Sequence, residues 1–207
     1  MGEKRATRSD KKHDVKLTVH TEFKEAIYRL AFITDVSIMD TVEAMLKHAI
    51  RSKRILNDVS PAFVRDIKID NIVYVGHLSA EKYADTPRAN PNYVRIKTRL
   101  TQTDYHVLAT IAYAMDVRPA RACAILTNEA FHSNYFLDNY IKRYMQRNIS
   151  DHKFLELKKI MEYAERDDNY NLNWASLLSY IVREVSEPMA TAKKKIDSLV
   201  INHWRNK

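Results

Sequence analysis

The sequence predicts a mainly α-helical protein with two short β-strands, in which one strand–helix–helix unit occurs twice. Apolar and polar residues alternate over residues 14–19 and again over 94–100, which is the period of a half-buried strand. Each run is followed by two segments whose apolar residues have helical spacing. The two copies align without a gap at a fixed offset of 81, which matches Val19 with Leu100. Such a fixed period indicates an internal duplication.

The first copy spans residues 14–53. Val15, Leu17 and Val19 are the apolar residues of its strand. Its first helix has apolar residues at positions 23, 26, 27, 30 and 31, and Ser37 is a favourable N-cap for the second helix. The apolar face of that second helix comprises Ile38, Val42, Met45, Leu46, Ala49 and Ile50.

The second copy spans residues 93–133. The inward residues of its strand and first helix are Val94, Ile96, Thr98, Leu100, Leu108, Ile111, Ala112 and Met115. Pro119 suits the first position of the next helix. Cys123 aligns with Val42, and we therefore expect it in the core rather than in the role of a nucleophile.

An arm, a linker and a C-terminal segment complete the predicted organisation. Residues 1–13 are predicted to form a flexible basic arm, and residues 54–92 a linker with a small β-hairpin around Asp70 and Asn71. Residues 134–207 are predicted to be helical. The amphipathic helices of this segment would either cover the tandem units or mediate self-association or binding of a protein partner. The candidate helices are Tyr135–Arg147, Asp151–Arg166, Asn173–Val185 and Met189–Trp204.

Composition limits the classes of function. The 34 basic against 26 acidic residues give a net charge of +8, which favours an anionic partner, with nucleic acid as the first candidate and a merely soluble basic surface as the alternative. Two glycines, Gly2 and Gly76, exclude glycine-rich phosphate-binding loops. One cysteine and eight histidines without metal-ligand spacing predict no disulfide, no metal site and no cofactor. Neither a signal peptide nor an apolar run of ~20 residues is present, so we expect a cytoplasmic, nucleoid-associated protein and no membrane partner.

Each copy resembles a ribbon-helix-helix unit of the MetJ/Arc superfamily of DNA-binding proteins. The matching residues are Lys16–Phe23 with Asp35–Ser37, and Arg95–Thr101 with Asp116–Arg118. Two units in one chain resemble the TraY relaxosome proteins of conjugative plasmids, from which the long linker and the C-terminal segment depart. The inter-helix turn, which usually has a glycine in this family, has Asp35 and Asp116 instead. Aspartate accepts unusual backbone angles better than most residues.

The resemblance implies that the two strands pair into an antiparallel ribbon, an intrachain pseudo-dimer, that enters the major groove of double-stranded DNA. The outward residues of the two strands, Asp14 among them, would then become the readers of the groove. The predicted base-reading residues are Lys16, Thr18, Arg95, Lys97 and Arg99. The start of each second helix would contact phosphate, through Ser37, Ile38 and Met39 in the first copy and Arg118 and Arg121 in the second. The alternative for the basic strand is a charged edge that prevents aggregation.

The expected function is that of a sequence-specific double-stranded DNA-binding transcriptional regulator, most simply a repressor that occupies a promoter. Because the two copies differ in charge, we expect an asymmetric DNA site. Two alternatives remain open: an accessory DNA-binding protein of plasmid transfer or partition, and an antitoxin-like interaction module without DNA. An enzyme is not expected, because no catalytic group stands out in the sequence.

Overall fold

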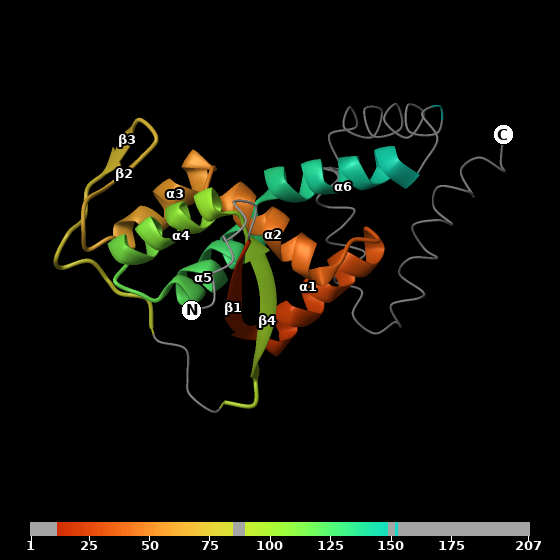
Figure 1. The fold of residues 1–207 in the computed structure, drawn as a ribbon, viewed down its shortest axis with the longest axis horizontal. Helices are drawn as coiled ribbons and strands as arrows, with labels where there is room; N and C mark the ends of the chain where they lie inside the picture. The colour runs from red at the N-terminus through yellow and green to blue at the C-terminus, as the bar shows by residue number, and fades with distance from the viewer. Residues whose placement is uncertain (1–11, 85–89, 149–151, 153–207) are drawn as a thin grey trace, which may run out of the picture. The chain divides into compact units, whose positions relative to one another are not determined.

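The computed structural model describes residues 12–84, 90–148 and 152 (Figure 1). The chain divides into two compact units. The first unit comprises residues 1–24 and 39–130, and the second comprises residues 25–38 and 131–207. Most of the predicted basic arm and the predicted helices after residue 150 lie outside the described residues.

The strand–helix–helix order occurs twice, as the sequence predicts. The first copy contains β1 (His13–His20), α1 (Thr21–Ile33) and α2 (Ile38–Ala49), and the second contains β4 (Tyr93–Leu100), α4 (Gln102–Ala114) and α5 (Pro119–His132). At the alignment offset, both bounds of α1 coincide with those of α4, and the first residue of α2 coincides with that of α5. The offset therefore holds to the residue for these helices.

The inter-helix turns of the two copies have the same backbone conformation. Asp35 has φ 51° and Asp116 has φ 55°, both in the left-handed region. In each turn the valine after the aspartate donates its N–H to the carbonyl oxygen five positions earlier, at 3.0 Å in both copies. This hydrogen bond closes the C-terminus of the preceding helix in the manner of a Schellman motif. The unusual backbone angles expected of the two aspartates are confirmed.

The two aspartates differ in the ion pairs of their side chains, so the same substitution is expected to have different effects at the two positions. Asp116 forms ion pairs with Arg65 and Lys82, both at 2.8 Å, and their hydrogen bonds, first that of Lys82, lower the pKa of Asp116 to about 2. We expect Asp35→Gly to raise the free energy of unfolding by up to about 1 kcal/mol, because glycine adopts positive φ without steric cost. Asp116→Gly should lack this gain, since it also removes the ion pairs. Denaturant unfolding of both variants measures the difference, and equal shifts would contradict it.

Strands β1 and β4 form a two-stranded antiparallel ribbon over their full length (Figure 1). Lys16 lies directly opposite Lys97, and these two lysines are equivalent positions in the alignment of the two copies. An approximate two-fold axis therefore passes through this pair, as it would in a symmetric pairing of two identical units. The flanking pairs on the same face are Asp14 with Arg99 and Thr18 with Arg95.

One face of the ribbon is part of the core. Its inward side chains, all at most 4% exposed, are Val15, Leu17, Val19, Ile96, Thr98 and Leu100. Thr98 is polar, and its hydroxyl donates to the carbonyl oxygen of Met39 at 3.0 Å, which ties β4 to the first turn of α2. Because a shift of one residue would turn every buried side chain outward, burial of this face specifies the register.

The segment between the copies folds as a structured connection. The hairpin predicted around Asp70 is confirmed as β2 (Ile67–Ile69) and β3 (Ile72–Tyr74), which pair antiparallel. Helix α3 (Lys53–Val59) and the short 3₁₀ turn at Ser60–Ala62 were not expected from the sequence. The apolar residues of this segment are buried, and they include Ile55, Leu56, Val59 and Phe63.

Gly76 is at a close approach of two backbone segments. A Cβ atom added there would lie 2.4 Å from the backbone nitrogen of Arg65, so no other residue fits without movement of the backbone. The Arg65 side chain in turn donates to the carbonyl oxygen of Tyr113 at 2.6 Å and lies over the Tyr113 ring. The connection is thereby fastened to the C-terminal end of α4.

Helix α6 (Asn134–Asn148) extends one residue at either end beyond the predicted Tyr135–Arg147. Its buried residues are Phe136, Leu137, Ile141 and Tyr144. Among the described residues, no helix combines the length and the apolar character that crossing a membrane requires.

Candidate nucleic-acid interface

The outward face of the β1–β4 ribbon, called the ribbon face below, brings all five predicted base-reading residues to one surface. They are exposed except for Thr18, which is half-buried. The six residues of the ribbon face are Asp14, Lys16, Thr18, Arg95, Lys97 and Arg99. Four cations and one carboxylate leave this face with three net positive charges. The alternation of the sequence sets which side chains point outward. The pairing of β1 with β4, which are distant in the sequence, places these outward side chains on one surface.

Two lysines of the ribbon face lie opposite each other at its centre. Lys16 pairs across the ribbon with Lys97, and like charges in that position destabilise a β-ribbon. Lys97 is compensated by the carboxylate of Asp14, 2.9 Å from its ammonium group. The side chain of Lys16 has no ion pair or hydrogen bond to any residue within 12–84 and 90–148. The centre of the ribbon therefore has a cation that an anionic ligand would stabilise.

Asp14 and Arg99 form one end of the ribbon face. The Asp14 carboxylate accepts from Lys97 at 2.9 Å and from Arg99 Nε at 3.2 Å. The hydrogen bond from Lys97 and the positive charges of both partners hold the pKa of Asp14 below its usual range. Asp14 was expected to point outward together with the other readers of the first strand. The ion pairs of Asp14 depend on the register between β1 and β4, and the alternation of residues within one strand does not predict that register.

Thr18 and Arg95 form the other end of the ribbon face. The side chain of Arg95 is exposed and, in the part of the chain that the structure describes, makes no ion pair or hydrogen bond. Beside this pair, the rings of His20 and Tyr93 meet edge to face, 5.5 Å between centroids. The two ends therefore differ: one guanidinium is held by a carboxylate, and the other is without such a partner among the described residues.

The predicted phosphate-contacting residues of the first copy lie at the start of α2. Ser37 precedes the helix and is exposed, and Ile38 and Met39 are its first two residues. Ser37 and Ile38 belong to the second unit and Met39 to the first. The three residues are consecutive in the chain. Met39 is also held to β4, because its carbonyl oxygen accepts a hydrogen bond from the Thr98 hydroxyl.

The predicted phosphate-contacting residues of the second copy have different surroundings. Arg118 is exposed immediately before α5, and its carbonyl oxygen accepts the first hydrogen bonds of that helix. Arg121 instead donates its guanidinium to the carbonyl oxygen of Ala84 at 2.8 Å. Arg121 therefore holds the connection between the copies, and Arg118 is the one of the two with an exposed side chain.

A buried ion network joins the two copies. Glu43 on α2 is 6% exposed and accepts from Lys12 at 2.9 Å and from Lys47 at 2.6 Å. Asp104 on α4 is 2% exposed and accepts from Arg51 at 2.8 Å. Burial raises the pKa of Glu43, but the hydrogen bonds from Lys47 and Lys12 outweigh it and leave the pKa below its usual range. Sequence patterns contain little signal for this network, because its pairs other than Glu43 with Lys47 join residues that are distant along the chain.

No cluster of three or more metal-ligating side chains is found among the described residues. Cys123 is fully buried, and burial raises the pKa of its thiol to about 12. Its predicted place in the core is confirmed, and at neutral pH its thiol is not ionised.

No protein-family model matches this chain, and comparison with curated proteins and with solved structures likewise finds no match. The assignment of function therefore depends on the geometry and charge of the ribbon face.

Proposed function

We propose that this chain is a sequence-specific double-stranded DNA-binding protein of the ribbon-helix-helix type that regulates transcription, most simply by occupying a promoter as a repressor. The observation that supports the proposal best is the ribbon face. It presents four cations on the side of the ribbon opposite to the buried side chains, and two of these cations, Lys16 and Lys97, face each other.

The two-stranded form and the chemistry of the ribbon face suit the DNA major groove. The groove admits a two-stranded ribbon, and guanine presents two acceptors, O6 and N7, to arginine or lysine. Arg95 is exposed and without a partner among the described residues, so its guanidinium is available for such a bidentate contact. Thr18 on the opposite strand offers a hydroxyl to a base edge or a methyl to thymine.

The repulsion between Lys16 and Lys97 also supports an anionic ligand. It costs free energy in the isolated protein, and the negative potential of DNA would offset that cost on binding. Burial of the inner face and the pairing of the two strands hold the ribbon in register without a ligand. The ribbon face is thereby preorganised, and one chain contains a complete ribbon.

The test is selection of bound sequences from a randomised duplex library, followed by affinity measurements over a salt series. We expect a defined sequence to be enriched and its affinity to fall steeply with salt. Lys16→Ala should weaken binding and reduce the slope of log K against log salt by about one, because one cation near the DNA is lost.

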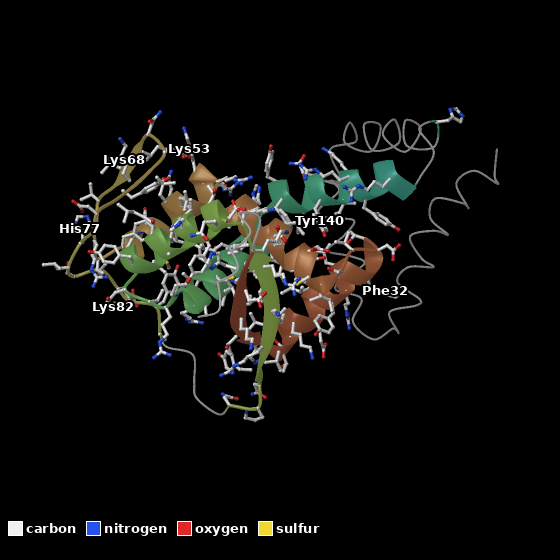
Figure 2. All side chains as sticks on the ribbon, in the orientation of Figure 1. Phe32, Lys53, Lys68, His77, Lys82 and Tyr140 are labelled. Atoms are coloured by element: carbon white, nitrogen blue, oxygen red, sulfur yellow. The ribbon has the colours of Figure 1, made fainter. Side chains whose placement is uncertain are left out.

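Lys68→Ala is the matched control for this experiment. Lys68 is also an exposed lysine on a strand, but it lies on the β2–β3 hairpin, which Figures 1 and 2 show apart from the ribbon. It should behave like the parent chain. Equal slopes for Lys16→Ala and Lys68→Ala would contradict a role of the ribbon face, and a chain that binds no duplex would favour the interaction-module hypothesis instead.

A further inference from the structure

The two ends of the ribbon face are equivalent in backbone and different in chemistry. In the alignment of the two copies, Asp14 matches Arg95, and Thr18 matches Arg99. One end therefore combines a carboxylate with a guanidinium, and the other combines a hydroxyl with a guanidinium. An acidic side chain on a surface that binds DNA repels phosphate, so its presence calls for an explanation.

The Asp14 carboxylate has a defined arrangement. Its two oxygens are divided between two cations, with Oδ2 facing the ammonium of Lys97 and Oδ1 facing Nε of Arg99. Only one nitrogen of the Arg99 guanidinium is engaged by Asp14, and the whole side chain is about half exposed. The terminal nitrogens of Arg99 therefore keep donors for another acceptor.

We propose that Asp14 is the specificity-determining residue at its end of the ribbon face, where its carboxylate and the guanidinium of Arg99 together select a cytosine amine beside a guanine. This inference rests on the proposed function, because it assigns a base preference to one part of the proposed DNA-binding surface.

The donor and acceptor pattern of the bases supports this selection. In the major groove, cytosine presents an N4 amine that donates, and a carboxylate accepts from it. Guanine presents only acceptors, which match the donors of Arg99. Because Asp14 and Arg99 lie directly opposite each other on paired strands, their side chains reach neighbouring positions of the groove.

Asp14 also restrains binding that is independent of sequence. Its ion pairs occupy Lys97 and Arg99, which would otherwise be available to phosphate groups. If no base amine is there to donate to Asp14, its carboxylate loses water next to DNA without gaining a hydrogen bond, which is unfavourable. The same side chain thus favours one sequence and disfavours contact with the backbone alone.

The experiment compares the parent chain with Asp14→Ala and with Asp58→Ala. Asp58 is an exposed aspartate on α3, so its replacement changes the net charge equally. Each full-length protein is used in selection from a randomised duplex library and in a salt titration on duplex of unrelated sequence. We expect Asp14→Ala to lose about tenfold discrimination at one edge of the selected site and to keep the preferences elsewhere. Its salt slope on unrelated duplex should rise by about one.

Asp58→Ala should keep every base preference of the parent. The inference is overturned if Asp14→Ala also keeps the preference at each position, or if it loses preference equally across the whole site. A parent chain that selects no sequence overturns the proposed function together with this inference. A parent that selects a site which Asp14→Ala reads identically overturns this inference alone.

Discussion

Arg95→Ala is expected to weaken binding to the selected duplex by about 10- to 100-fold, the loss of one bidentate guanine contact of about 1–3 kcal/mol. Arg95 is the exposed cation at its end of the ribbon face and has no carboxylate partner among the described residues, so nothing within the ribbon competes with the base for it. Binding to unrelated duplex should change much less, because base contacts add little to it. Fluorescence anisotropy on both duplexes, at one fixed salt concentration, measures the ratio.

Arg54→Ala is the matched control for this prediction. Arg54 is an exposed arginine on α3, and its replacement alters the net charge by the same amount. If the two variants lose affinity equally for both duplexes, then Arg95 acts only through its charge, and base recognition by the β1–β4 ribbon is not supported.

Asp104→Ala is expected to lower the free energy of unfolding by about 2 kcal/mol, because it removes hydrogen bonds at a buried site and weakens a helix cap. The carboxylate is 2% exposed and accepts from Arg51 and from the hydroxyl of Thr101, at 2.8 and 2.7 Å. The backbone N–H of Asp104 donates to the same hydroxyl, which caps α4. Removal of the carboxylate leaves these partners without their acceptor and weakens the cap.

A double-mutant cycle with Arg51→Ala separates the ion pair from the cap. Arg51→Ala leaves the buried Asp104 carboxylate without its closest cation, whereas Asp104→Ala leaves an arginine that is 67% exposed and is hydrated. Arg51→Ala alone should therefore cost at least as much as Asp104→Ala. Urea unfolding of the parent, both single variants and the double variant gives the coupling energy. A coupling energy near zero, with Arg51→Ala as stable as the parent, would contradict the network as described.

Local patterns were sufficient for the repeated unit. Alternation over residues 14–19 and 94–100 predicted both strands, because one face of each is buried and the other exposed. The spacing of residues such as Leu108 and Ile111 predicted the helices for the same reason. Breaks in the helical spacing predicted the turns at positions 35 and 116, and the resemblance to a family with glycine there implied the unusual backbone angles of the two aspartates. These features depend on neighbours in the sequence, and the structure confirms them.

Features that depend on distant residues could not be predicted in the same way. The pairing of Lys16 with Lys97, and of Asp14 with Arg99, follows from a register between strands that are far apart in the sequence. Helix α3 is shorter than a periodicity window, and its burial comes from tertiary packing. Arg121 was expected to contact a DNA phosphate because it lies near the start of a helix. Its hydrogen bond to the carbonyl oxygen of Ala84 depends on where the segment between the two copies runs, which the sequence does not predict.

Because β1 and β4 belong to one chain, formation of the ribbon does not depend on protein concentration. A ribbon assembled from separate chains separates on dilution, and each strand is then left with unpaired backbone groups. Here the fastened connection keeps the strands at an effective concentration of order millimolar, whatever the amount of protein present. Occupancy of a site should accordingly rise in direct proportion to protein at low concentration, as for a one-step association, even when a cell contains only a few copies.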